Sequence, residues 1–201
     1  AASDVYKRQL KILNHYNIKC KLHSYHEHSN PKTRKFIIDE IKKGKCISLV
    51  SDAGTPLISD PGFKLVKELK SKNIKITSCP GPSSPIAALI MSGLPTDKFF
   101  FSGFLPVKIK AKKEYLTSLK NFNSSLIFFE SSKRLLKSLE IMLEIFGDRN
   151  ISVCRELTKK FEEVISHKIR DVIKNISSRK SIKGEIVIVV EGSNDSGGSV
   201  N

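Results

Sequence analysis

Short apolar runs alternate along the chain with segments in which apolar residues recur at helical spacing. The apolar runs predict buried strands over residues 45–50, 74–79, 99–101, 126–129, 151–154 and 185–190. Between them, apolar residues at helical spacing predict helices over residues 32–43, 60–72, 83–92, 109–122, 131–146 and most of 161–176. This alternation of strands and helices is typical of an α/β fold with parallel strands.

The rhythm is interrupted at residues 92–97, SGLPTD, and then restarts. We therefore predict an N-terminal α/β domain over residues 1–95 and a C-terminal α/β domain over residues 96–192. The last residues, 193–201, are polar and rich in Gly and Ser, and we expect a flexible tail.

Composition narrows the class of protein. The chain has 201 residues, of which 39% are hydrophobic and 27% charged, which excludes a disordered or low-complexity chain. Lys and Arg number 35 against 20 Asp and Glu, giving a net charge of +15. Such a surplus favours a polyanionic partner, most often nucleic acid. The alternative is a compositional preference for Lys at solvated positions.

Four cysteines, Cys20, Cys46, Cys79 and Cys154, are too widely spaced for a zinc finger or a disulfide framework. The last three lie in apolar runs, so we expect buried free thiols and a reducing, cytoplasmic location. The sequence has no apolar run long enough for a transmembrane span and no apolar signal core near its start, so no membrane association is expected.

Residues 50–62, VSDAGTPLISDPG, form the most informative segment, because they follow a predicted strand and precede a predicted helix. A plain connection of this kind needs only two to six residues or so. Gly54 would let a ligand approach the backbone, Pro56 would stiffen the turn, and Asp60 is the predicted N-cap. Loops beyond the carboxyl ends of strands form ligand crevices in α/β folds, so we predict a binding loop.

A second loop of the same kind covers residues 79–85, CPGPSSP. Ser83 and Ser84 would either cap the following helix or offer hydroxyls and amides to a ligand. Two such loops after adjacent strands are expected to face the same crevice.

Two later segments also place charged residues after predicted strands. In residues 128–134, FFESSKR, Glu130 and Arg134 would bind a ligand or pair with each other. In residues 151–163, ISVCRELTKKFEE, Arg155 and Glu156 follow the strand, whereas Glu162 and Glu163 are interpreted as a solvated helix face.

Histidines cluster in residues 22–30, LHSYHEHSN. The spacing of His26 and His28 permits a metal ligand pair, but no third ligand lies nearby, so no metal is predicted. A capping loop or one that faces RNA is favoured, because Tyr and His stack on bases. The sequence also lacks the glycine-rich loops of phosphate-loop ATPases and dinucleotide-binding folds, and the nucleophile elbow of hydrolases.

Five motifs in order resemble the tetrapyrrole methylase superfamily: SDAGTPLISDPG, PGPSSPIAALIMSGLP, FFESSKRL, CRELTKKFEE and KGEIVIVVEG. Within it the chain is similar, from about Lys11 to Gly192, to the ribosomal RNA small-subunit methyltransferase I family, including the SYHEH segment. The resemblance implies two α/β subdomains with mainly parallel or mixed sheets and a cleft between them that binds S-adenosyl-L-methionine. It also implies a homodimer that methylates the ribose 2′-hydroxyl of a cytidine in small-subunit (16S) ribosomal RNA.

The resemblance further assigns a set of residues that line the cofactor. They are Asp52, Ala53, Gly54, Thr55, Pro56, Leu57, Ile58, Pro82, Ser83, Ser84, Phe129 and Leu157. Glu130 and Glu156 are the candidate catalytic bases, and Arg134 or Lys159 would orient the acid or the nucleotide. Phosphate contacts with no motif behind them are expected at Arg34, Lys108, Lys110, Lys112 and Lys113.

The family pattern also includes a first strand with a T-P-I-G-N-L-type loop, an A-E-D-T-R segment and a helical extension after the last strand. This sequence matches none of these, so it is expected to be truncated at both ends, with an incomplete N-terminal sheet and reduced activity. Two alternatives stay open: a corrinoid or porphyrin methylase of the same superfamily, and an RNA-binding module without catalysis. The +15 charge and the SYHEH segment favour an RNA substrate over a tetrapyrrole.

Overall fold

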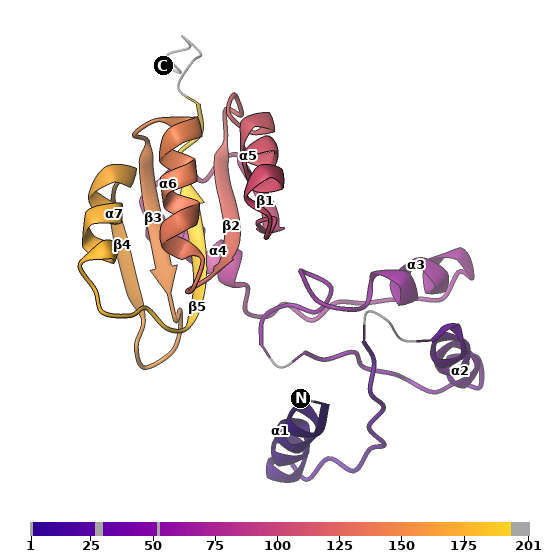
Figure 1. Cartoon of the computed structure of the whole chain (residues 1–201). Coiled ribbons are helices and arrows are strands. Elements are labelled where there is room, and N and C mark those ends of the chain that lie inside the picture. Colours follow the sequence, from indigo (N-terminus) through magenta and orange to yellow (C-terminus); the bar gives the residue numbers. More distant parts are fainter. Residues whose placement is uncertain (1, 27–29, 52, 194–201) are drawn as a thin grey trace. The chain divides into compact units, whose positions relative to one another are not determined.

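The computed structural model describes residues 2–26, 30–51 and 53–193. The chain forms two compact units, residues 1–82 and 83–201, and each is described separately (Figure 1). The sequence pattern placed this division near residue 95. The helix over residues 84–92, which the pattern assigned to the N-terminal half, packs in the structure on the sheet of the second unit.

The first unit is helical in its regular structure, with α1 (Ala2–His15), α2 (Pro31–Lys42) and α3 (Phe63–Ser71). Its small core joins α2 to α3 through four buried side chains, Ile37, Ile38, Leu65 and Leu69. The Asn30 side chain caps α2 by accepting a hydrogen bond from the Lys32 N–H at 3.0 Å. Gly44, with φ of +87°, follows the C-cap residue of α2, Lys43.

The strands predicted over residues 45–50 and 74–79 are wrong: among the described residues, both segments run without strand pairing. Without a ladder there is no sheet face to bury alternate side chains, and Ile47 and Val50 are exposed. For the same reason Cys46 and Cys79 are exposed, contrary to the expected buried thiols. Helix α3 begins at Phe63 with Gly62 as its N-cap, so Asp60 does not have the predicted capping role.

The second unit contains a five-stranded mixed sheet in the order β1-β2-β5-β3-β4. The strands are β1 (Phe99–Phe104), β2 (Ser125–Ser131), β3 (Asn150–Arg155), β4 (Glu163–Lys168) and β5 (Glu185–Val190). The β1–β2 pair is parallel, and the three other pairs are antiparallel. The predicted α/β class with a mainly parallel or mixed sheet is confirmed, and the four strand predictions in this half are correct. The sheet is mixed, whereas the alternation of strands and helices alone had indicated parallel strands.

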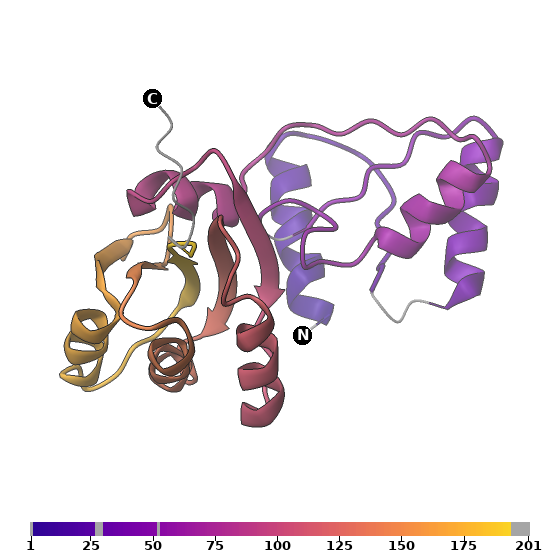
Figure 2. The ribbon, with the colours of Figure 1, turned by 90° about the horizontal axis from the view of Figure 1, so that it is seen from above.

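Helices cover both faces of this sheet (Figure 2). Helix α4 (Ser84–Ser92) packs on one face, and α5 (Ile109–Ser118), α6 (Leu135–Phe146) and α7 (Ile169–Ser177) pack on the other. Side chains alternate accordingly along β2: Leu126 and Phe128 enter the core beneath α5–α7, whereas Ile127 and Phe129 face α4. The near-continuous apolar sequences of β2 and β5 follow from this burial on two sides.

The helix predicted over most of residues 161–176 is partly wrong, because β4 occupies its first half and α7 begins only at Ile169. Residues of β4 pair antiparallel with β3, from Arg155 opposite Glu163 to Asn150 opposite Lys168. Val164 and Ile165 pack on opposite faces of the sheet, which is the period of a strand. The alternation of side chains in β4 is short, and the helical spacing of apolar residues in α7 led the sequence pattern to extend the predicted helix over it.

Candidate functional site

The loop before α3 has an unusual backbone. Gly54, Leu57 and Ser59 all have positive φ, at +74°, +74° and +57°. Such values are uncommon for residues other than glycine and cluster at functional sites. A turn closes between them, in which the Ile58 N–H donates to the Thr55 carbonyl at 3.2 Å. Asp52 lies outside the described residues.

Two glycines of this loop differ in their surroundings. A Cβ on Gly62 would lie 2.7 Å from Leu57 Cδ1 and 2.9 Å from Leu49 Cδ2, so Gly62 is needed for close packing. A Cβ on Gly54 would meet no atom within 4 Å. The backbone at Gly54 is therefore open to a ligand, which fits the binding role predicted for this loop.

A hydrogen bond connects the two loops that the sequence analysis singled out. The Thr55 hydroxyl donates to the Pro82 carbonyl at 2.8 Å, across 27 residues of chain. Two predicted cofactor residues of the first unit are thus held together, while neighbouring Ala53 and Ile58 are exposed and Pro56 is half-buried.

The predicted cofactor residues of the second unit gather on the face of the sheet that carries α4. Ser83 is the N-cap residue of α4, and its carbonyl accepts a hydrogen bond from Ala87; Ser84 is the first residue of the helix. Phe129 and Leu157 pack against the apolar cluster beneath α4. Phe129 and Leu157, at and just beyond the carboxyl ends of β2 and β3, thus lie on the same face of the sheet as α4.

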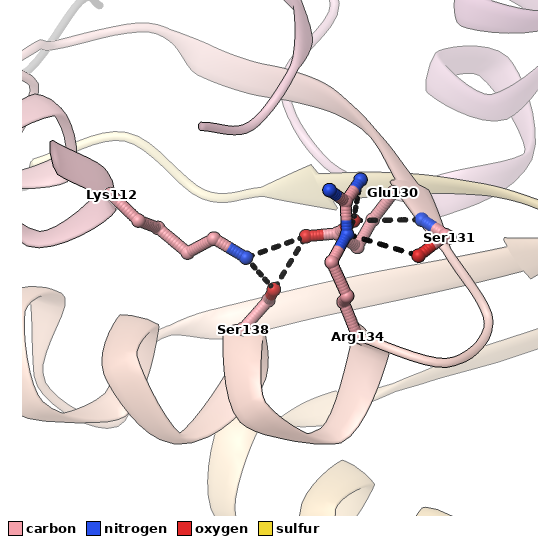
Figure 3. Close-up of polar contacts among 5 residues, drawn as sticks. All are labelled: Lys112, Glu130, Ser131, Arg134 and Ser138. Atoms are coloured by element: carbon pink, nitrogen blue, oxygen red, sulfur yellow. Dashed lines mark hydrogen bonds and ion pairs between the residues drawn. The ribbon is translucent and has the colours of Figure 1, made fainter. Parts of the chain in front are cut away.

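Glu130, next to Phe129 on β2, points to the opposite face and is buried beneath α5 and α6 (Figure 3). Its Oε2 accepts hydrogen bonds from Lys112 Nζ at 2.9 Å and Ser138 Oγ at 2.5 Å. Its Oε1 accepts from the Ser131 N–H at 2.7 Å and pairs with Arg134 Nη2 at 2.8 Å. Both oxygens are engaged by groups of this unit.

Burial raises the pKa of the Glu130 carboxyl, but hydrogen bonds from Lys112, Ser138 and the Ser131 N–H outweigh it and lower the pKa overall. Glu130 is therefore an ionised carboxylate held by its neighbours. Its proposed role as a catalytic base stays a prediction that this arrangement does not favour. Lys112 is only 3% exposed, so its expected role as a phosphate contact is wrong.

Sequence reasoning missed Ser138, which contributes to the same group. The residue lies on the apolar face of α6, between Leu135 and Met142, and is fully buried. A small polar residue on an apolar helix face is the signal that would have indicated a buried polar partner.

Glu156 has a different environment at the end of β3. Its φ is +50°, and its Oε1 accepts hydrogen bonds from the Glu185 N–H at 2.9 Å and Lys159 Nζ at 3.1 Å. These two bonds lower the pKa of the Glu156 carboxyl. A Cβ on Gly184 would lie 2.5 Å from Glu156 Cγ, so the carboxylate is packed against a position that only glycine fits. Its catalytic role stays a prediction.

The remaining candidates are distributed over both units. Arg34 pairs with Glu68 at 3.3 Å and Lys113 pairs with Glu144 at 2.7 Å, whereas Lys108 and Lys110 are exposed at the start of α5. Glu163, expected on a solvated helix face, belongs to β4 and pairs with Arg155 and Arg179.

The histidine segment is only partly described, because Glu27 and His28 lie outside the described residues. The His23 ring packs on Phe36 with centroids 5.1 Å apart, and His26 Nε2 lies 2.6 Å from Ser24 Oγ. Within the described ranges, no three His, Cys, Asp or Glu side chains are grouped to hold a metal ion. No helix in those ranges is long and apolar enough to cross a membrane.

Comparison with known proteins gives a consistent picture. The family model of tetrapyrrole (corrin/porphyrin) methylases matches residues 2–173. A relative from Rickettsia prowazekii, named ribosomal RNA small subunit methyltransferase I, is 48% identical over 90% of this chain, which spans 65% of that relative. A Thermotoga maritima protein of the same name is 42% identical over 92% of this chain and 83% of its own length.

Solved structures show the same fold at low sequence identity. The methyltransferase CobJ superposes with a TM-score of 0.62 and 17% identity, covering 89% of this chain and 79% of its own. The cobalt precorrin-4 methyltransferase CbiF superposes with a TM-score of 0.56 and 19% identity, covering 86% and 73%. Together these matches agree with the five ordered motifs of the sequence.

Proposed function

Because the chain belongs to the tetrapyrrole methylase family and, within it, to the ribosomal RNA small subunit methyltransferase I group, we propose that it methylates small-subunit ribosomal RNA. The methyl donor is S-adenosyl-L-methionine, and the acceptor is the ribose 2′-hydroxyl of a cytidine. The observation that carries the proposal is the shared name of relatives that are 42–48% identical over nine-tenths of this chain.

The residues present fit the methyl donor, which has an amino-acid part, a ribose and an adenine. Such a ligand needs free backbone polar groups and an apolar surface. The loop with positive φ at Gly54 and Leu57 is the proposed source of the first, because a Cβ on Gly54 would meet no atom within 4 Å. Phe129 and Leu157 supply the second. We also propose contacts with the methyl donor for residues 52–58 and Pro82 of the first unit and for Ser83 and Ser84 of the second unit.

When bound, S-adenosyl-L-methionine supplies an activated methyl group on a sulfonium. The residues of the chain then have to hold the ribose hydroxyl in line with that group, and orientation of this kind contributes about 7–11 kcal/mol to catalysis. Glu156, ionised at the end of β3, is the candidate base for the hydroxyl proton. For Glu130 the contacts support a role in holding Arg134 instead.

The net charge of +15 supports an RNA substrate, because phosphate neutralisation dominates the affinity of RNA-binding proteins. Lys108 and Lys110, both exposed at the start of α5, are the proposed phosphate contacts. We further propose that the protein acts as a homodimer in the cytoplasm. A corrinoid or porphyrin substrate, the second candidate, is favoured only by the family-level name and by structural neighbours such as CbiF.

The experiment that tests the function is tritium transfer from labelled S-adenosyl-L-methionine to small ribosomal subunits that lack the modification. Label in the 2′-O-methylcytidine of 16S RNA is the expected result. Because the chain spans 65% of the R. prowazekii relative, the same assay is run on a version extended to that relative's length, with a higher rate expected. Transfer to a tetrapyrrole and none to RNA by both versions would overturn the proposal.

The cofactor loop is tested by Gly54→Ala, with Gly44→Ala as the matched control. Both glycines have positive φ, +74° and +87°, and a Cβ at either meets no atom within 4 Å. Both substitutions therefore impose similar backbone strain, of about 1–2 kcal/mol. Calorimetric titration is expected to show roughly tenfold weaker cofactor binding for Gly54→Ala alone. Equal affinities of the two variants would place the cofactor elsewhere.

A further inference from the structure

Four side chains form a polar path from the core of the second unit to its surface (Figure 3). Lys112 and Glu130 are both buried, with side chains 3% and 0% exposed. Arg134 lies at the outer end with a side chain 29% exposed, and buried Ser138 bridges Lys112 and Glu130. The path joins α5, β2 and α6.

Charges along this path do not cancel. Lys112 and Glu130 form a buried pair at 2.9 Å, so the carboxylate is already compensated inside the core. Arg134 then pairs with the same carboxylate at 2.8 Å and leaves a residual charge of one cation at the partly exposed end. A buried ion pair is costly to desolvate and contributes little net stability compared with apolar residues, so stability alone gives no reason for this arrangement.

The guanidinium of Arg134 is fixed on one side. Its Nε donates to Glu130 Oε1 at 2.9 Å and to Ser131 Oγ at 3.0 Å, and its Nη2 pairs with the same carboxylate oxygen. No acceptor for its Nη1 is found among the residues that the structure describes. Arginine carries five N–H donors in a rigid planar group. The Nη1 donors of Arg134 can therefore bind a further oxyanion while Nε and Nη2 stay on Glu130.

We propose that Lys112 and Ser138 are positioning residues that hold Glu130, and through it Arg134, so that Arg134 binds a phosphate oxygen of the substrate RNA. This inference rests on the proposed function for the identity of the substrate. Exposed Lys133, directly before Arg134, and the net charge of +15 favour an RNA phosphate over the carboxylate of the methyl donor as the oxyanion.

The first test compares Arg134→Ala with Lys137→Ala in filter binding of 16S RNA. Both variants remove one cation from the region of α6, but Lys137 is 59% exposed and pairs with Glu140 outside the path. We expect about tenfold weaker binding for Arg134→Ala, the effect of one charge-assisted hydrogen bond. Its salt dependence should be shallower by roughly one phosphate contact. Lys137→Ala should bind within about twofold of the wild type.

The second test replaces the inner path by apolar residues in one triple variant, Lys112→Met, Glu130→Leu and Ser138→Ala. This variant loses one cation and one anion, so its net charge equals that of the wild type. Buried ion pairs tolerate such replacement by apolar residues of similar volume. If the path positions Arg134, the folded variant binds RNA as weakly as Arg134→Ala, and adding Arg134→Ala changes nothing further.

Wild-type RNA affinity in the folded triple variant would overturn the proposal, since the path would then serve the core alone. Loss of S-adenosyl-L-methionine affinity in Arg134→Ala, with RNA affinity unchanged, would also overturn it and assign Arg134 to the methyl donor. RNA binding is measured without methyl transfer, so the proposal is decided even if the wild type transfers no methyl group. The proposed function is decided separately, by whether this chain and its extended version transfer methyl groups to RNA or to a tetrapyrrole.

Discussion

Two carboxylates of this protein, Glu40 on α2 and Glu130 on β2, each bind two cations, but the cations differ in how exposed they are to water. Glu40 pairs with Lys43 at 2.9 Å and with Lys45; the two lysine side chains are 68% and 62% exposed, and the side chain of Glu40 is 14% exposed. Glu130 pairs with Lys112 and Arg134, and its own side chain is fully buried. Each carboxylate therefore pairs with two cations, but water reaches both lysines of Glu40 and does not reach Lys112.

The pKa of Glu40 is lowered to about 2 by hydrogen bonds from Lys45 and Lys43. That of Glu130 is lowered as well, but against the opposing effect of burial. At the surface, a lysine that loses its partner returns to water at little cost. In the core, the same loss leaves a charge without solvent or partner. The lowered pKa values of Glu40 and Glu130 therefore do not by themselves measure how much each ion pair contributes to the free energy of unfolding.

The largest effect is expected from Lys112→Met, which leaves Glu130 buried without its inner cation. Breaking a buried pair from one side costs about 3–5 kcal/mol in the free energy of unfolding. The matched control is Lys113→Met, the next residue on α5, whose pair with Glu144 has side chains 42% and 58% exposed. Urea denaturation followed by circular dichroism should separate the two variants clearly. Similar midpoints would show that the buried pair behaves like a surface pair.

A smaller effect is expected in the pH dependence of stability. The pKa of Glu130 in the folded state lies below its ordinary value of 4.5, so the unfolded chain binds its proton more readily. The stability contributed by Glu130 is therefore fully present above about pH 4.5 and is lost as the pH falls through the lower, folded-state pKa.

The comparison for this pH effect is the triple variant Lys112→Met, Glu130→Leu and Ser138→Ala. Denaturation midpoints are measured from pH 7 to pH 3 for both proteins. We expect the wild type to lose more stability than the triple variant over the acid part of this range. Parallel curves would mean that Glu130 does not titrate differently in the two states.

The two units also differ in how well the sequence predicted them. In the second unit, strands over residues 126–129, 151–154 and 185–190 were correctly predicted, because apolar runs buried on two faces leave a strong signal. In the first unit, residues 45–50 and 74–79 carry the same signal but have no strand partner in the described structure. A strand is a property of pairing, which a local pattern does not contain.

The candidate site shows the same limit. The loop through Gly54 was predictable, because its length and its Gly and Pro content are local features. The burial of Lys112 was not predictable, because it depends on the contacts of this α5 residue with Glu130 on β2 and with Ser138 on α6. Alternation along β2 could have separated Phe129 from Glu130, because adjacent strand residues face opposite sides of the sheet.

The smallest effect is expected from Glu40→Gln, although the pKa of the Glu40 carboxyl is lowered to about 2. Its folded-state pKa lies below the ordinary 4.5, so any stability from its charge is present above about pH 4.5 and fades as the pH falls toward 2. Because both lysines stay largely in water, the pair should contribute little at neutral pH. Amide hydrogen exchange of α2 at pH 7 should be the same in Glu40→Gln and the wild type, while Lys112→Met should speed exchange in β2. Faster exchange throughout α2 in Glu40→Gln would show that an ion pair with exposed lysines stabilises the small core of the first unit. The exposure of the cationic partners would then not explain the difference in stability between the Glu40 and Glu130 pairs.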